Sequence, residues 1–261
     1  MDGIEISRKP VSGFRHIELN ETQSTNLECL ERARAGDPGH LWITARKQTG
    51  GRARRGRSWV SEPGNLYASL LLIDPAPLDR LASLPLAVSL AVYDAIRREL
   101  PADVDVRIKW PNDVLVEGCK VSGILLEGES LRNGHHALVI GCGINIAHKP
   151  VEALYPVTCL AERGATCSPE ILFARLYEAM ERLLNVWNRG EGTAALVDQW
   201  RQVARGIGQP VTVNLPDRSL QGVFSGIDAH GMLLLDLPDG TRQAIAAGDV
   251  FFLGQEGQER S

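Results

Sequence analysis

The chain has 261 residues, of which 44% are hydrophobic and 23% charged, and its formal net charge is -4. This balance is that of an ordinary globular protein and argues against a disordered or fibrous chain. Because the net charge is negative, the protein is no general binder of polyanions, so any contact with phosphate must come from a local cluster of basic residues.

The first predicted elements are a strand over residues 14–19 and a helix that ends before Gly36 and Pro38. Ser24, Thr25 and Asn26 stand at the start of this helix, where such residues most often serve as caps. Thr25 and Glu28 have the spacing of a capping box. On its own, this segment indicates a helix start and no more.

A loop rich in glycine and arginine, QTGGRARRGRSW (residues 48–59), joins predicted strands at 40–46 and 65–73. Its glycines let the backbone approach an anion, and its four arginines offer planar sets of donors that suit phosphate or carboxylate oxygens. The alternatives are a solvated basic loop or a nucleic-acid contact, although no second basic stripe supports the latter. Trp59 either stacks on a base or fills the core.

Residues 79–100 carry apolar side chains at helical spacing from Leu81 to Ile96, which predicts a helix that covers one face of a sheet. Short β-like runs follow, punctuated by glycine and proline, and then two helices. The runs cover residues 106–110, 113–118, 120–128 and 136–147, and the helices 169–189 and 192–205. The pattern predicts an α+β domain with a mixed β-sheet flanked by helices.

From about Gly208 the chain changes to short strands separated by Gly, Asp and Pro turns, including an Asp239-Gly240 hairpin turn. This pattern predicts a small antiparallel β-barrel of roughly 50 residues. The expected domains are therefore residues 1–207 and 208–261.

The segment IKWPNDVLVEGCKVSGILLEG (residues 108–128) carries the second set of candidate site residues. Asn112 and Asp113 follow Pro111 at a strand start, where they either bind a ligand or form a simple turn. Lys120 enters an apolar strand after a Glu117-Gly118 turn, so its ammonium group must either extend to solvent or meet an anion, and we favour the anion. The later GCGINIA motif (residues 141–147) is weak evidence for any site.

Several enzyme classes lack support in the sequence. There is no Walker A motif, no HExxH and no GxSxG, and the six histidines have no metal-ligand spacing. The five cysteines form no CxxC pair and are odd in number, so we expect reduced, mostly buried thiols rather than disulfides or a zinc ribbon. No signal-peptide core and no apolar run of about 20 residues occurs, so we expect no membrane association and a cytoplasmic location.

In this order, STN, QTGGRARRGRSW, KWPND, KVSGIL and GCGIN resemble the biotin protein ligase family (biotin-acetyl-CoA-carboxylase ligases). The similarity runs from about Ser24 to Ala147, and the β-rich tail looks like the SH3-like domain of that family. The resemblance implies the class II synthetase-like fold of biotin and lipoate ligases. It also implies an enzyme that uses ATP to activate biotin as biotinyl-5'-AMP and transfers the biotinyl group to a lysine.

The resemblance assigns roles to individual residues. Biotin contacts are expected from Ser24, Thr25, Asn26, Gln48, Arg52, Ala53, Arg54 and Lys120. ATP and adenylate contacts are expected from Gly51, Arg52, Arg54, Arg55, Trp59, Asn112, Asp113, Gly123 and Asn145. Catalytic roles fall to Lys120, Arg54 and Asp113. No metal ligand is certain, since magnesium would arrive on the ATP phosphates, with Asp113 as a candidate ligand.

The expected acceptor is the biotin carboxyl carrier domain of a biotin-dependent carboxylase. The family's loop usually reads GRGRRG, and Ala53 in place of the middle glycine makes a positive φ harder there. Only about 20 residues precede STN, so we expect no winged helix and no DNA binding. The oligomeric state stays open, a homodimer included.

Three other functions remain as alternatives. A lipoate ligase would share the sheet but is expected to lack this arginine loop. A non-enzymatic nucleic-acid-binding module would bind without ATP, with an affinity that falls steeply as salt rises. A regulatory protein would bind biotinyl-adenylate without transferring it.

Overall fold

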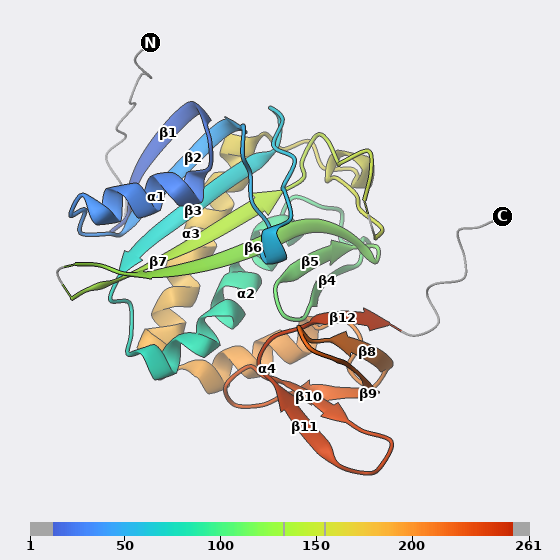
Figure 1. The fold of residues 1–261 in the computed structure, drawn as a ribbon. Helices are drawn as coiled ribbons and strands as arrows, with labels where there is room; N and C mark the ends of the chain where they lie inside the picture. The colour runs from blue at the N-terminus through green and yellow to red at the C-terminus, as the bar shows by residue number, and fades with distance from the viewer. Residues whose placement is uncertain (1–12, 133, 154, 253–261) are drawn as a thin grey trace.

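The computed structural model describes residues 13–132, 134–153 and 155–252. A seven-stranded mixed sheet forms the larger part, in the order β1-β2-β3-β7-β6-β5-β4 (Figure 1). Its strands are β1 (Arg15–Thr22), β2 (Leu41–Gln48), β3 (Leu66–Ile73), β4 (Val106–Lys109), β5 (Asp113–Val116), β6 (Cys119–Ser130) and β7 (His136–Ile144). Only β1 and β2 run parallel, and the other neighbours are antiparallel. The predicted mixed sheet is confirmed.

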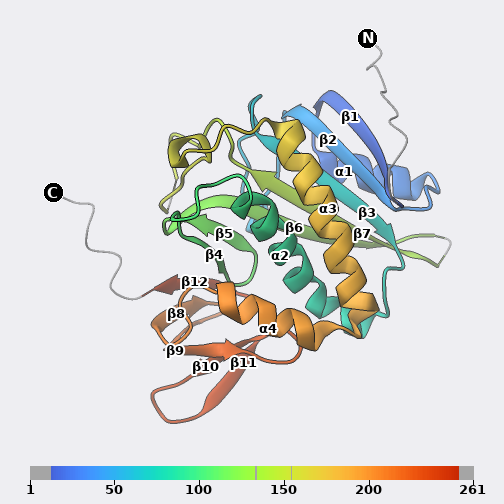
Figure 2. The same cartoon turned by 180° about the vertical axis from the view of Figure 1, so that it is seen from behind.

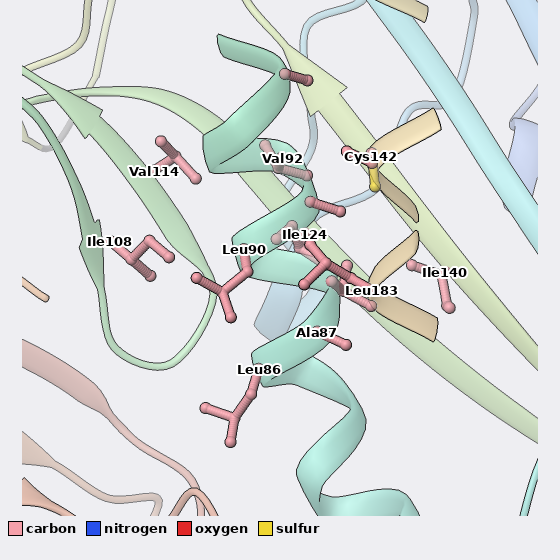
Figure 3. Packing of buried hydrophobic residues seen from close by; sticks show 14 of the residues in the cluster. Leu86, Ala87, Leu90, Val92, Ile108, Val114, Ile124, Ile140, Cys142 and Leu183 are labelled. Carbon is pink, nitrogen blue, oxygen red and sulfur yellow. The ribbon is translucent and has the colours of Figure 1, made fainter. Parts of the chain in front are cut away.

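Helices cover the two faces of this sheet unequally. On the back, α2 (Leu84–Arg97) and α3 (Pro169–Trp187) pack against each other and against the sheet, and α4 (Thr193–Val203) lies beside them (Figure 2). The apolar stripe of α2 packs against strand residues whose side chains point to the back of the sheet, such as Ile124, Ile140 and Cys142 (Figure 3). Because side chains alternate across a strand, the residues next to these three in sequence point to the front.

On the front, α1 (Thr25–Arg34) covers only part of the sheet. Its Cys29, Leu30 and Ala33 bury a second apolar cluster that includes Leu71 and Val139. This cluster lies toward the β1 side of the sheet. The front of β5, of β6 and of the end of β7 near Ile144 is therefore left for other segments. The predicted Gly- and Arg-rich loop crosses that free area, where it contains the short 3-10 turn η1 (Arg54–Gly56) (Figure 1).

The C-terminal part is a five-stranded antiparallel sheet in the order β11-β10-β9-β8-β12. Its strands are β8 (Pro210–Asn214), β9 (Ser219–Ile227), β10 (Leu233–Asp236), β11 (Arg242–Ile245) and β12 (Asp249–Phe252). The two parts are joined by contacts such as the hydrogen bond that the Trp110 indole N–H donates to the Gly231 carbonyl, at 3.0 Å. Both views place β12 beside β4 and β5 (Figures 1 and 2).

Two local predictions were wrong. The capping box does not form, because Thr25 lies inside the helix and its hydroxyl donates to Gln48, while Glu28 accepts a hydrogen bond from Thr22. The helix expected from residue 79 begins as a 3-10 segment (Leu78–Ser83), and the α-helix starts only at Leu84, with a proline in its first turn.

The predictions for the cysteines and for the Glu117-Gly118 turn are confirmed. All five cysteines are free thiols, three of them buried. The Glu117-Gly118 turn forms, and both of its residues adopt a positive φ. None of the helices in the described part of the chain is long and apolar enough to cross a membrane.

Candidate active site

A cavity of about 420 Å³ lies on the front of the sheet, below the Gly- and Arg-rich loop and against β12. It is lined by most of the residues that the sequence singled out: Ser24, Thr25, Asn26, Gln48, Arg52, Ala53, Arg54, Trp59, Asn112, Asp113, Lys120, Gly123 and Asn145. Two do not line it. Gly51 lies behind Trp59, whose carbonyl oxygen would be 2.4 Å from a Cβ at that position. Arg55 points toward the C-terminal sheet, where it donates to the carbonyl of Asn214.

Strand register arranges the floor of the cavity in two rows. In the first row, Ser69 of β3 is opposite Gly141 of β7, which is opposite Leu125 of β6. Two residues further along, a longer row crosses five strands, with Tyr67, Gly143, Gly123, Asp113 and Lys109 as successive partners. Both rows face the front because strand side chains alternate with a period of two.

A hydrogen-bonded group at the start of α1 forms one end of the cavity. The Gln48 side-chain oxygen accepts from the backbone N–H of Thr25 at 2.9 Å and from its hydroxyl at 3.1 Å. The Ser69 hydroxyl lies 2.7 Å from the Thr25 hydroxyl oxygen and 2.5 Å from Asn26 Oδ1. Because Thr25, Asn26 and Ser69 are buried and the four side chains are bonded to one another, their orientations are fixed before any ligand arrives.

Glu127 of β6 connects this end to the loop, and sequence analysis did not identify it. Its carboxylate accepts from the Asn26 side-chain amide at 2.8 Å and from the Arg52 guanidinium at 2.8 Å. One carboxylate therefore orients a predicted biotin-binding residue and holds the beginning of the loop.

Trp59 lies over the second row of the floor. A Cβ at Gly143 would be 2.6 Å from its indole ring, and one at Gly123 would be 3.0 Å from it. The indole therefore rests directly on backbone at both positions. Its Nε1 is buried and has no hydrogen-bond partner among the described residues. A buried donor without an acceptor is costly, which makes this N–H a candidate contact for a bound ligand.

Beside Trp59, the expected anion for Lys120 is present. Its ammonium nitrogen lies 2.8 Å from the Asp113 carboxylate, and also 5.6 Å from the centroid of the Trp59 ring and 5.2 Å from that of Tyr155. Aromatic faces stabilise a cation without neutralising it. These contacts hold the lysine in place within the cavity.

The loop folds as a small hairpin whose arginines converge on Asp249 of β12. Asp249 lies 3.8, 3.0 and 3.7 Å from the guanidinium groups of Arg54, Arg55 and Arg57. Burial lowers the pKa of Arg54, and the charge of Asp249 opposes that shift. Three arginines that share one carboxylate of the same chain do not form the outward-facing stripe that the nucleic-acid alternative requires.

The substitution at Ala53 does not strain this loop. Ala53 is extended, with a φ of -124°, and the positive φ values fall on Arg55 and Gly56. The concern that alanine hinders a left-handed conformation therefore does not apply to the conformation seen here.

Two asparagines hold the edges of the cavity. Asn112 accepts from Arg54 at 3.0 Å and donates to the carbonyl of Ile124, so it joins the loop to β6. Asn145 donates to the carbonyl of Thr158 at 3.2 Å. These bonds fix the orientation of both amides at the edge of the cavity.

Sequence reasoning also missed cavity residues that come from outside the motifs. Lys109, Tyr155, Asp249 and Phe251 line the cavity, but only Lys109 lies within a segment that the sequence had singled out, as the first residue of KWPND. Asp249 and Phe251 come from the C-terminal sheet, more than a hundred residues from the other lining segments of the sheet floor, and nothing local marks them.

Comparisons with known proteins point to one family. Residues 15–145 match the biotin/lipoate A/B protein ligase family, and residues 206–253 match the biotin protein ligase C-terminal domain. The biotin–acetyl-CoA-carboxylase ligase of Paracoccus denitrificans is 38% identical over 90% of this chain and 100% of its own length. The bifunctional ligase/repressor BirA of Escherichia coli is 33% identical over 87% of this chain and 70% of its own.

Among solved structures, a biotin protein ligase from Aquifex aeolicus in complex with biotin and ATP superposes with a TM-score of 0.76. It is 28% identical in sequence, and the match covers 91% of this chain and 97% of that one. The family match covers half of the chain, and the Paracoccus relative is matched along its whole length. This chain is therefore a member of the biotin/lipoate A/B protein ligase family.

Proposed function

We propose that this protein is an ATP-dependent biotin ligase that forms biotinyl-5'-AMP and transfers the biotinyl group to a specific lysine of a biotin carboxyl carrier domain. One observation carries the proposal: a single cavity joins the fixed polar group around Thr25 and Asn26 to the cationic and aromatic group around Lys120 and Trp59. The first suits a neutral polar ring, and the second suits a carboxylate that must meet a nucleotide phosphate. The relatives named as biotin ligases, and the one solved with biotin and ATP, support the same reading.

In the first half-reaction, a carboxylate oxygen of biotin attacks the α-phosphorus of ATP. The new O–P bond forms as the bond from the α-phosphorus to the bridging oxygen breaks, and pyrophosphate leaves with that electron pair. Both reactants are anions, so cations must screen them. In our proposal Lys120, Arg52 and Arg54 supply these cations, and their contacts with Asp113, Glu127 and Asn112 hold them in position before the substrates arrive.

In the second half-reaction, the neutral amine of the acceptor lysine attacks the carbonyl carbon of the mixed anhydride. An amide bond forms, AMP leaves, and the nitrogen loses a proton. Asp113 faces the cavity and is the candidate to orient the amine or accept that proton. A loop that closes over the anhydride would exclude water, which otherwise hydrolyses it.

Magnesium fits this site only as a companion of the triphosphate. No group of three or more His, Cys, Asp or Glu side chains that could hold a metal ion occurs in the part of the chain that the structure describes. Asp113 supplies one hard oxygen donor, which suffices where phosphates complete the coordination. When bound, the ion would neutralise charge on the triphosphate.

We also propose a division of labour along the chain, with substrate binding in residues 1–207 and a supporting role for residues 208–261. The acceptor is the carrier domain of a biotin-dependent carboxylase. The five free thiols favour a reducing compartment, so the cytoplasm is the expected location.

The test is incorporation of labelled biotin into a purified biotin carrier domain, with and without ATP, and with lipoate as a competing acid. We expect ATP-dependent labelling that excess lipoate does not reduce. Lys120→Ala is expected to lower the rate by at least about a hundredfold, the usual scale for loss of a charge-stabilising donor. Lys47→Ala is the matched control, because Lys47 pairs with Glu21 and does not line the cavity.

Each other outcome selects an alternative. Adenylate formation without transfer would favour a regulatory binder, and competition by lipoate would favour a lipoate ligase. Binding without ATP that weakens steeply with salt would favour a nucleic-acid module.

A further inference from the structure

Lys109 is a cavity residue to which neither the motifs nor the proposed mechanism gives a role. It is the last residue of β4, and its cross-strand partner is Asp113. It therefore ends the row of the floor that begins at Tyr67 and passes beneath Trp59. The side chain lines the cavity at the end nearest β12.

The charge of Lys109 has no paired carboxylate in the part of the chain that the structure describes. Among the described residues, no carboxylate forms a salt bridge with it: Asp113 is paired with Lys120, and Asp249 is shared by three arginines. Its ammonium nitrogen instead lies 5.5 and 5.9 Å from the ring centroids of Phe251 and Phe252. Burial is the main cause that lowers the pKa of Lys109, while Asp113 and Asp249 oppose the shift.

A half-buried cation without a counter-ion is unfavourable unless an anion arrives. The surrounding groups show which end of a ligand would supply it. The polar group around Thr25 and Asn26 lies beside the first row of the floor, and Lys120 lies beside Trp59 on the second. Lys109 is two strands beyond Gly123 in that second row, on the side away from α1.

The direction of the reaction indicates which part of ATP would lie near Lys109. In a displacement at the α-phosphorus, the attacking carboxylate and the leaving pyrophosphate lie on opposite sides of the phosphorus atom. If the acid enters from the Asn26 side and meets phosphate near Lys120, the pyrophosphate is directed toward β4 and β12. The cations there are Lys109 and the loop arginines.

We propose that Lys109 binds the β- and γ-phosphates of ATP and stabilises the departing pyrophosphate. The inference deepens the proposed function and rests on it. In this role no proton or electron is transferred through Lys109. It stabilises the electron pair that the bridging oxygen gains when its bond to the α-phosphorus breaks. The same side chain makes no contact with the adenylate product, because the adenylate lacks these two phosphates.

The experiment compares wild type, Lys109→Met and Lys109→Arg in biotin-dependent exchange of labelled pyrophosphate into ATP. Lys109→Met is expected to raise the KM for ATP and the inhibition constant of pyrophosphate by about tenfold or more, the scale of one charge-assisted hydrogen bond. The KM for biotin and the affinity for a non-hydrolysable biotinyl-adenylate analogue should change less than about twofold. Lys109→Arg should recover most of the affinity for pyrophosphate.

Arg107→Met is the matched control. Arg107 lies two residues earlier on the same strand, pairs with Asp105 and does not line the cavity. It is expected to leave all four constants unchanged.

The outcomes separate this inference from the function on which it rests. Exchange that is absent in wild type would overturn the proposed function. Active wild type with an unchanged ATP KM and unchanged pyrophosphate inhibition in Lys109→Met would overturn only the role of Lys109. A loss of affinity for ATP, biotin and the adenylate analogue together, with a lowered Tm and no rescue by arginine, would mean that Lys109 acts through its packing on Phe251 and Phe252, and would also overturn it.

Discussion

The ammonium group of Lys120 lies 2.8 Å from the carboxylate of Asp113, and the two side chains are only 13% and 22% exposed. Because the pair faces the cavity, an incoming anion must share the lysine with an aspartate that is already there. The aspartate therefore both fixes the lysine and opposes the binding of phosphate.

This relationship predicts non-additive effects in a double-mutant cycle. Lys120→Met leaves the Asp113 carboxylate unpaired, so the loss of stability should exceed that caused by removing the lysine contact alone. We expect the free energy of unfolding to be lower by about 1 to 3 kcal/mol. Lys120→Met combined with Asp113→Asn should recover the Tm and part of the affinity for ATP, but not the rate of adenylate formation. Equal and additive losses in both measurements would mean that the pair is not coupled.

The glycines of β7 predict a separation of the two subsites. A Cβ at Gly141 would lie 2.3 Å from Asn26 Oδ1, whereas one at Gly143 would lie 2.6 Å from the Trp59 indole. Gly141→Ala should therefore raise the KM for biotin, and Gly143→Ala the KM for ATP, each by about tenfold, since overpacking costs about 1 to 3 kcal/mol.

The control for these two variants is Gly128→Ala on β6, where a Cβ would meet nothing closer than 3.8 Å. It should leave both KM values as in wild type. Steady-state kinetics with each substrate varied in turn would settle the matter, and an identical effect of Gly141→Ala and Gly143→Ala on both substrates would contradict two separate subsites.

The convergence of three arginines on Asp249 predicts that this carboxylate restrains the ligand-free loop. Asp249→Asn should make trypsin cleave between residues 52 and 57 severalfold faster, because Arg54, Arg55 and Arg57 lose their shared partner. Biotin and ATP together should restore protection. Asp217→Asn serves as the comparison, since Asp217 pairs with its neighbour Arg218 and not with a loop arginine among the described residues. Unchanged cleavage would place the restraint in other contacts of the loop, such as those of Arg52 with Glu127 and of Arg54 with Asn112.

The sequence predicts the elements that local rules control. The apolar stripe of α2, the strand at β3 and the loop between two strands all depend on neighbouring residues. The strand and the loop form where expected, whereas the α-helix starts at Leu84 rather than at residue 79. The motif residues also meet in one cavity, because most of them lie at strand ends or on the front of β6 and β7.

Relations that depend on register and on long-range packing lie beyond such rules. The prediction of a capping box was wrong because the Thr25 hydroxyl donates instead to Gln48, which lies on β2. Asp249 and Phe251 reach the cavity only because β12 packs beside β4, and no local pattern reports that contact. A role for Lys109 can be inferred only once the structure shows that Asp113 and Asp249 pair with other cations.

Burial of the Cys142 thiol in the core predicts how stability depends on alkaline pH. Burial raises the pKa of Cys142 from 9.0 to about 12, and it also raises the pKa of Tyr67 to about 12. A folded-state pKa above the unfolded value means that the folded form holds the proton more tightly. The contribution of the protonated thiol to stability is therefore fully present below pH 9.0 and is lost as the pH rises toward 12.

Tm measured between pH 8 and 11 should fall less steeply in Cys142→Ala than in wild type, although the Tm of the variant starts lower because of the cavity that the substitution creates. Cys119→Ala, at a half-buried thiol outside the core, should keep the wild-type slope. Parallel slopes in wild type and Cys142→Ala would show that this thiol stays protonated or ionises without affecting the fold.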